Sequence, residues 1–111
     1  MKSDFIVILT TCKNRRQARD ITDLLLKKRL VACANIMPGV ESKFWWGGKL
    51  DEAKEVLVMM KTRKENFEVV EKNIKRLHSY EVPEIIAMPI VDGSRYYLNW
   101  VDSSVGQCQG L

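Results

Sequence analysis

The feature that most constrains the fold of this chain is a long predicted β-hairpin between Val31 and Thr62. Two apolar, alternating arms, VACANIMPGVESKFWW and KLDEAKEVLVMMKT, flank the dipeptide Gly47-Gly48. A two-residue Gly-Gly connection is typical of a hairpin, because both central residues need a positive φ. Pro38-Gly39 predicts a bulge or bend in the first arm, since proline has no N–H to donate to a sheet.

The predicted hairpin is too long for the domain that carries it. Arms of about 14 residues at ~3.3 Å per residue span roughly 45 Å. A compact domain of 111 residues has a radius of gyration of about 13 Å and a width nearer 35 Å. The tip, with Phe44, Trp45 and Trp46, is therefore expected to overhang its domain. An exposed apolar tip favours association, so we predict that neighbouring subunits cover these rings; the alternative is that the rings fold back on their own sheet.

Before the hairpin, the sequence predicts a strand and an amphipathic helix. The run FIVIL from Phe5 to Leu9 is apolar at every position, as in a strand that is buried on both faces. Asn14 is a favourable N-cap, and the helix after it carries apolar residues on one face. These residues are Ala18, Ile21, Leu24 and Leu25.

After the hairpin, the sequence predicts a second helix and an edge strand. Thr62 and Glu65 have the spacing of a capping box, and they precede a helix with one apolar face. That face carries Phe67, Val70, Ile74 and Leu77. Pro83 then precedes the short strand EIIAMPI, in which Pro89 predicts a position at the edge of the sheet.

The end of the chain completes the predicted architecture. Asp92-Gly93 predicts a turn, and Ser94 predicts the N-cap of a short last helix. The element order β-α-β-β-α-β plus a terminal helix predicts one α+β domain over residues 1–111, with the ferredoxin-like arrangement of an antiparallel sheet and helices on one face. We predict a flexible tail over about residues 103–111, because this segment is polar and contains glycine.

Composition excludes several classes of protein. A hydrophobic content of 46% with 29% charged residues is typical of a soluble globular protein, and no apolar run is long enough for a membrane helix. The start MKSDFIVIL contains Asp4 and lacks the apolar core of a signal peptide, so we expect a cytoplasmic location. Basic clusters end both predicted helices, where cations interact favourably with the helix dipole; we expect no nucleic-acid partner despite the net charge of +4.

The sequence offers few residues for metal or nucleophile chemistry. Cys12, Cys33 and Cys108 form neither a disulfide framework nor a CxxC motif, and Cys33 is expected to be a small buried residue in an apolar strand. His78 is the single histidine, which argues against a two-histidine zinc site in one chain. No known catalytic or nucleotide-binding motif occurs, so we expect a protein that is not an enzyme.

Several long runs resemble the CutA family of divalent-cation tolerance proteins. They are ACANIMPGVESKFWWGGKL (Ala32–Leu50), MKT (Met60–Thr62), YEVPEIIAMPI (Tyr80–Ile90) and YYLNWV (Tyr96–Val101). The family is similar in fold to nitrogen-regulatory PII proteins, and its members form homotrimers through the extended hairpin. The resemblance therefore implies a PII-like homotrimer that acts in tolerance of copper or another divalent cation.

The resemblance also implies candidate metal ligands. Some members carry a cysteine at the end of the first strand and a His-His pair before a Tyr-x-x-Pro-Glu motif, both proposed as copper ligands. Here those positions read Thr10 and Leu77-His78, and Cys12 lies two residues beyond Thr10. Imidazole and carboxylate ligands suit Cu²⁺. The ligand set predicted for Cu²⁺ or a similar cation is His78, Glu81, Glu84 and Cys12.

Two alternatives accompany this ligand set. Pro83 holds Val82 extended, so we predict that Tyr80–Glu84 lines a cleft between subunits; the alternative is a polar loop after a helix stop, with His78 as a helix-end residue. The predicted function is divalent metal (copper) homeostasis with weak metal binding rather than catalysis. The alternative is a PII-like signalling or scaffolding trimer, whose inter-subunit clefts hold a small anionic ligand or a protein partner.

Overall fold

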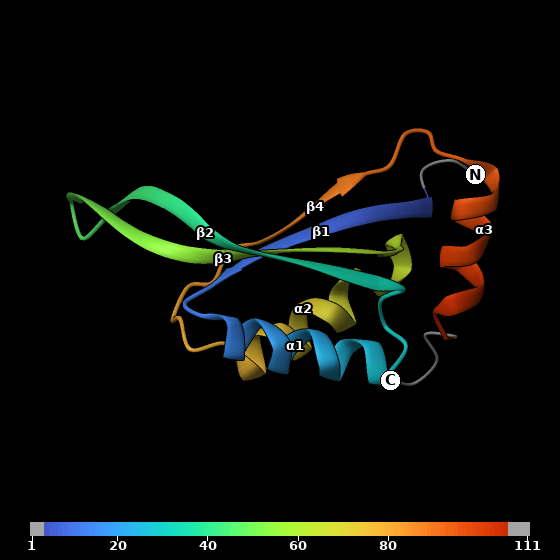
Figure 1. Cartoon of the computed structure of the whole chain (residues 1–111), viewed down its shortest axis with the longest axis horizontal. Coiled ribbons are helices and arrows are strands. Elements are labelled where there is room, and N and C mark those ends of the chain that lie inside the picture. Colours follow the sequence, from blue (N-terminus) through green and yellow to red (C-terminus); the bar gives the residue numbers. More distant parts are fainter. Residues whose placement is uncertain (1–3, 107–111) are drawn as a thin grey trace.

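The computed structural model describes residues 4–106 and contains four strands and three α-helices within them (Figure 1). In chain order they are β1 (Phe5–Cys12), α1 (Arg15–Lys27), β2 (Cys33–Trp46), β3 (Lys49–Arg63), α2 (Phe67–Leu77), β4 (Ile85–Pro89) and α3 (Arg95–Ser104). A short 3₁₀ turn, Lys64–Asn66, leads into α2. None of the described helices is long and apolar enough to cross a membrane.

The strands form one antiparallel sheet in the order β2-β3-β1-β4. Helices α1 and α2 lie against one face of this sheet, and α3 lies at its end (Figure 1). The predicted ferredoxin-like architecture is therefore confirmed. Strand β4 lies at one edge of the sheet, as predicted from the proline at position 89.

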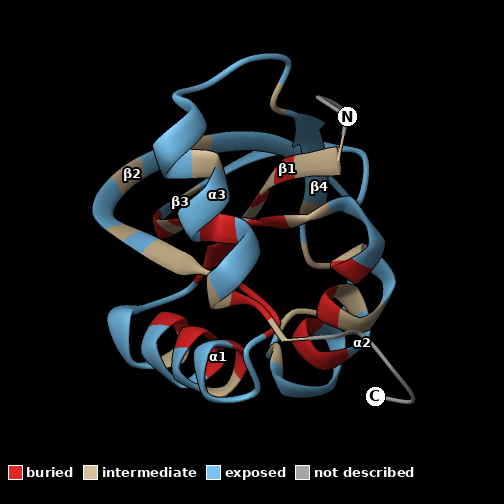
Figure 2. Cartoon of the chain, turned by 90° about the vertical axis from the view of Figure 1, so that its right-hand side faces the viewer, coloured by how far each residue is buried: buried red, intermediate tan, exposed pale blue. Residues whose placement is uncertain are grey.

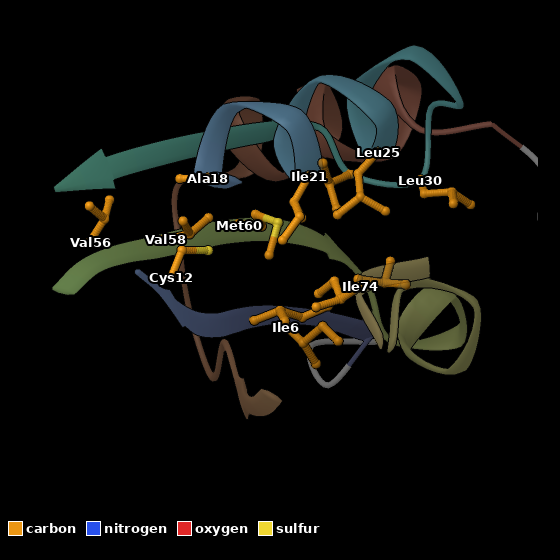
Figure 3. Close-up of a cluster of buried hydrophobic side chains, with 13 residues drawn as sticks. Ile6, Cys12, Ala18, Ile21, Leu25, Leu30, Val56, Val58, Met60 and Ile74 are labelled. Atoms are coloured by element: carbon orange, nitrogen blue, oxygen red, sulfur yellow. The ribbon is translucent and has the colours of Figure 1, made fainter. Parts of the chain in front are cut away.

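The hydrophobic core lies between the sheet and helices α1 and α2. Buried residues lie along the sides of both helices that face the sheet (Figure 2). Ile21 and Leu25 of α1 are fully buried with Ile74 of α2 (Figure 3). Over the predicted run from Phe5 to Leu9, only Ile6 and Ile8 are buried, so the prediction of a strand buried on both faces is wrong for the single chain. The reason is that no described helix covers the other face at Val7 and Leu9, which stay half-buried.

The long hairpin is confirmed. Strands β2 and β3 contain 14 and 15 residues, and Trp46 pairs with Lys49 across the turn. Gly47 and Gly48 have φ of 59° and 79°, so both use the conformation that makes a Gly-Gly turn favourable. The predicted bulge lies between Met37 and Val40. The hairpin projects from the domain along the longest of its three dimensions, 43 × 28 × 22 Å (Figure 1).

The helix starts were predicted with mixed success. Asn14 caps α1 as expected, with its Oδ1 accepting from the Gln17 N–H at 2.9 Å. The capping box at Thr62 and Glu65 is wrong, because Thr62 is a buried residue of β3 whose hydroxyl donates to the Leu30 carbonyl at 2.6 Å. Glu65 forms an ion pair with Arg63 instead, and α2 begins two residues later than Glu65.

The C-terminal helix is more ordered than its polar sequence predicted. Ser94 caps α3 as expected, and α3 continues to Ser104, inside the predicted flexible tail. Val105 is only 9% exposed, and the Gly106 N–H donates to the Arg29 carbonyl at 2.8 Å. The prediction is therefore wrong for residues 103–106, because this segment packs back on the end of α1. Its remaining residues, Cys108 included, lie outside the described part of the chain.

The face of the sheet opposite α1 and α2 is apolar and largely open. Helix α3 covers only the end of it, where the Tyr97 hydroxyl lies 3.5 Å from the Cys33 sulfur. Cys33 is only half-buried on this face, so its predicted burial as a core residue is wrong. Farther along, the register places the apolar side chains of three neighbouring strands on this face. They are Val7, Leu9, Leu57, Met59, Ile86 and Met88, of which Ile86 is 48% exposed and Met88 45%.

Candidate functional site

A groove of about 900 Å³ runs beside the hairpin. One wall is the hairpin from position 41 to 55, and the other is the connection between α2 and β4. The lining residues are Thr11, Glu41, Ser42, Lys43, Phe44, Trp45, Trp46, Asp51, Ala53, Glu55, Ser79, Tyr80, Glu81, Val82 and Glu84. The size lies within the range of small-molecule sites, so we regard this groove as the candidate functional site.

The register of the hairpin decides which tip side chains share a face. Phe44 pairs with Asp51, and Trp45 pairs with Leu50. Because successive side chains of a strand point to opposite faces, Phe44, Trp46, Asp51 and Glu55 share one face and Trp45 lies on the other. The rings are 37%, 71% and 55% exposed in chain order. The rings therefore remain partly exposed in the single chain, and the prediction that neighbouring subunits cover them stays a prediction.

A buried carboxylate lies at the inner end of the groove. Glu55 is only 8% exposed, and the Tyr80 hydroxyl donates to its Oε2 at 2.7 Å. Burial, followed by this hydrogen bond and the charge of Glu55, raises the pKa of Tyr80 above its ordinary value. Among the described residues, no cationic side chain forms an ion pair with Glu55, and no donor reaches its second oxygen. Glu55 is therefore a largely buried carboxyl group with one hydrogen-bond partner among the described residues.

His78, the predicted imidazole ligand, uses both ring nitrogens inside the chain. Its Nδ1 accepts a hydrogen bond from the Tyr80 backbone N–H at 3.1 Å, and its Nε2 lies 2.8 Å from the Thr11 carbonyl oxygen. Because Nδ1 accepts, the ring proton that these contacts require is on Nε2, which donates to Thr11. A metal ion would have to displace one of these bonds. In this structure, His78 instead ties the end of α2 to the end of β1.

Cys12 is a core residue rather than an accessible ligand. It is fully buried beside Val56 and Val58 (Figure 3). Burial, followed by the charge of Glu55, raises the pKa of the Cys12 thiol to about 11. Metals bind the thiolate form of cysteine, and this environment disfavours that form.

Glu81 and Glu84 are exposed and line the groove, as the predicted cleft requires, although here the opposite wall belongs to the same chain. The four predicted ligands do not come together. Among the described residues, no group of three or more histidine, cysteine or acidic side chains could hold a metal ion. A metal site inside one chain is therefore not assembled, and the binding of a metal by these residues stays a prediction.

Sequence reasoning missed the residues that make the groove distinctive. Glu55 directly precedes the apolar run VLVMM, and an acidic residue at the border of a buried run is the signal that could have found it. Asp51 pairs with Phe44 in the register, but nothing in the local sequence singled it out. Tyr80 was predicted to line a cleft, but not as the partner of Glu55.

Residues 6–104 match the family described as "CutA1 divalent ion tolerance protein". The chain belongs to this family. The resemblance in the hairpin and in the Tyr80–Ile90 segment is thereby confirmed.

Individual relatives agree with this assignment. The chain is 41% identical over 100 residues to "Divalent-cation tolerance protein CutA" of Thermus thermophilus. This match covers 90% of this chain and 97% of the relative. The chain is 37% identical over 99 residues to "Protein CutA 1, chloroplastic" of Oryza sativa. The match covers 89% of this chain but only 56% of that relative. A solved structure of the "Periplasmic divalent cation tolerance protein CutA" of Archaeoglobus fulgidus has a TM-score of 0.89 at 40% identity, over 92% of this chain and 99% of that one.

Proposed function

We propose that this CutA-family protein acts in divalent-cation tolerance as a homotrimer that binds a cation such as Cu²⁺ weakly and without catalysis. The proposal of cation binding rests on the negative charge of the groove. Five carboxylates line it, from Glu41, Asp51, Glu55, Glu81 and Glu84, against the single cation of Lys43. The chain as a whole has a net charge of +4, so the groove is an acidic region on a basic protein.

Weak binding is what the ligand chemistry supports. The imidazole of His78 and the thiol of Cys12, which Cu²⁺ would prefer, are engaged or buried. The exposed carboxylates of Glu81 and Glu84 remain as accessible oxygen ligands. Without a preformed set of three ligands, the binding free energy must also offset the ordering of flexible side chains.

The open apolar face of the sheet supports the oligomer. Ile86 and Met88 are nearly half-exposed in one chain. In the sheet, Ile86 pairs with Leu9 of β1 and Met88 pairs with Val7, so the four apolar side chains are neighbours on one face. A contiguous exposed apolar surface marks a protein–protein interface, and the projecting tip with Trp45 adds to it. We therefore propose that the sheets of three chains pack together on this face.

The alternative function, a PII-like trimer that binds a small anion, is disfavoured by the same groove. An anionic ligand there would meet five carboxylates and one ammonium group, and like charges in a partly buried site repel strongly. The charge of the groove does not argue against the other form of this alternative, a signalling or scaffolding trimer that binds a protein partner. The proposed compartment is the cytoplasm, and cell fractionation tests it; two relatives carry the words "chloroplastic" and "periplasmic" in their names.

Calorimetric titration with Cu²⁺ tests the metal proposal. We expect weak binding that the double variant Glu81→Gln/Glu84→Gln reduces further, whereas Glu68→Gln on the exposed side of α2 serves as a matched control. Equal affinity in wild type and the double variant would contradict the role of these carboxylates. A larger loss in His78→Ala than in the double variant would show that the imidazole leaves its two hydrogen bonds to bind metal.

Light scattering tests the trimer. We expect a mass three times that of the 12.8 kDa chain. Ile86→Glu places a charge on the open sheet face and should dissociate the oligomer, whereas Leu26→Glu, at a residue of α1 that is 39% exposed, should not. A monomeric wild type, or a trimer unaffected by Ile86→Glu, would contradict the proposed packing.

A further inference from the structure

The layer formed by α1 and α2 carries the positive charge of this protein. Residues 13–29, which include α1, and Phe67–Leu77 of α2 contain ten lysine or arginine residues and four acidic ones, whereas the remainder of the chain contains eight and ten. This layer lies on the other side of the sheet from the proposed trimer face, and the outer sides of both helices are exposed (Figure 2). It is therefore accessible to an anionic partner in the assembled protein.

Within this layer, one buried amide holds two cationic side chains together. Asn73 of α2 is only 6% exposed. Its Oδ1 accepts from the Lys28 ammonium at 3.2 Å and from the Arg76 guanidinium at 3.1 Å, while its Nδ2 donates to the Val69 carbonyl at 2.8 Å. A flipped amide would point its own N–H groups at both cations, so the network fixes this orientation. The two cationic nitrogens therefore lie within roughly 6 Å of each other, a separation at which like charges repel.

No carboxylate of the described chain balances these two charges. Lys28 and Arg76 form none of the ion pairs found within residues 4–106, and Lys72, one helical turn before Arg76, forms none either. Lys75, by contrast, pairs with Glu71 at 3.2 Å. The helix dipole favours single cations near the ends of α1 and α2, but it supplies no counterion for two that meet at one oxygen. The remaining N–H donors of both groups have no acceptor among the described residues.

We propose that Lys28 and Arg76 form a binding site for a phosphate group, with Asn73 as the positioning residue that holds the two cations together. A phosphate monoester or inorganic phosphate has three or more acceptor oxygens and, when doubly ionised, the charge to balance both side chains. The guanidinium supplies a planar fork and the ammonium a point charge, and both bind phosphate. Lys72 adds a third charge beside them on α2. The phosphate belongs to a small phosphorylated molecule or to a phosphorylated side chain of a protein.

Calorimetric titration of the assembled protein tests this proposal, in a buffer free of phosphate and sulfate and at constant ionic strength. The probes are inorganic phosphate and a capped alanine–phosphoserine–alanine tripeptide. The controls are the unphosphorylated tripeptide and dimethyl phosphate, whose single charge corresponds to a nucleic-acid backbone. We expect saturable binding of the two probes, and dimethyl phosphate should bind at least about fivefold more weakly because it balances only one of the two cations. Tighter binding of the phosphorylated tripeptide identifies a protein source, and tighter binding of inorganic phosphate identifies a free phosphate.

Two pairs of adjacent cations provide matched variants. Lys28→Gln and Arg76→Gln should each weaken the binding of inorganic phosphate about tenfold, because each removes a charge-assisted hydrogen bond. Lys27→Gln and Lys75→Gln remove the same charge at the neighbouring positions and should change the affinity by less than about twofold, since solvent and salt screen exposed charges. All four side chains are exposed, so none of these changes disturbs the core.

Three results would overturn the proposal. They are equal binding of dimethyl phosphate and inorganic phosphate, equal losses within each pair of adjacent variants, and no saturable binding of either probe at millimolar concentration. The proposal does not rest on metal binding, because the site lies on the helices and not in the groove. The double variant Glu81→Gln/Glu84→Gln should therefore bind phosphate with the affinity of the wild type, so either proposal can fail while the other stands.

Discussion

The hydrogen bond between Tyr80 and Glu55 gives the sharpest prediction about stability. Tyr80→Phe removes the hydroxyl that lies 2.7 Å from Oε2 of a carboxylate that is 8% exposed. Hydrogen bonds to charged groups contribute about 1.5–3 kcal/mol, and loss of one partner leaves the other buried without a donor. Because Tyr80 itself is only half-buried, we expect Tyr80→Phe to lower the free energy of unfolding by about 2 kcal/mol.

Urea denaturation followed by circular dichroism, at one fixed protein concentration, measures this loss. Tyr96→Phe is the matched control, since Tyr96 is 86% exposed and surface changes stay within about 0.5 kcal/mol. A double-mutant cycle with Glu55→Ala isolates the pair and should give a coupling free energy above about 1 kcal/mol. Equal effects of the two Tyr→Phe changes, or an additive cycle, would refute the view that Tyr80 stabilises the Glu55 charge.

Three further outcomes follow from burial, capping and ionisation. Leu25→Ala should cost about 2–5 kcal/mol in thermal or urea unfolding, and Leu26→Ala far less, because Leu25 is fully buried and Leu26 is 39% exposed. Asn14→Ala should cost about 1 kcal/mol and lower the helical signal of α1. The pKa of Cys12 rises from 9.0 to about 11 on folding, so wild type should lose roughly 2 kcal/mol more than Cys12→Ala as pH increases from about 9 to 11.

The loss of stability at alkaline pH follows from how tightly the Cys12 thiol holds its proton in the folded and unfolded states. Folded Cys12 holds its proton more tightly than unfolded Cys12, so its contribution to stability is complete below the unfolded pKa of 9.0 and is lost as pH rises through about 11. Unfolding curves of wild type and Cys12→Ala at several alkaline pH values check it. Parallel loss of stability in the two proteins would contradict a buried, desolvated thiol.

Much of the fold could be predicted because its local signals agree with each other. The Gly47-Gly48 turn, the bulge at Pro38-Gly39 and the cap at Asn14 each depend on residues that are close in sequence. The errors occurred where distant segments compete for the same group. Thr62 has the sequence of a helix cap, but its hydroxyl bonds to the Leu30 carbonyl, 32 residues away. Capping rules consider only neighbours along the chain and do not include such a partner.

The site could be predicted only in part, because it depends on where one strand stops. The last pair between β1 and β3 is Cys12 with Val56, so Glu55, the residue of β3 that precedes Val56, has no β1 neighbour. The connection after α2 fills that position, fastened by His78 to Thr11, and it brings the Tyr80 hydroxyl to the Glu55 carboxylate. If β1 paired for two more residues, a strand would replace Tyr80 and the groove would close. Strand ends are the least certain feature of any sequence-based prediction, so a groove created by a strand end becomes evident only in three dimensions.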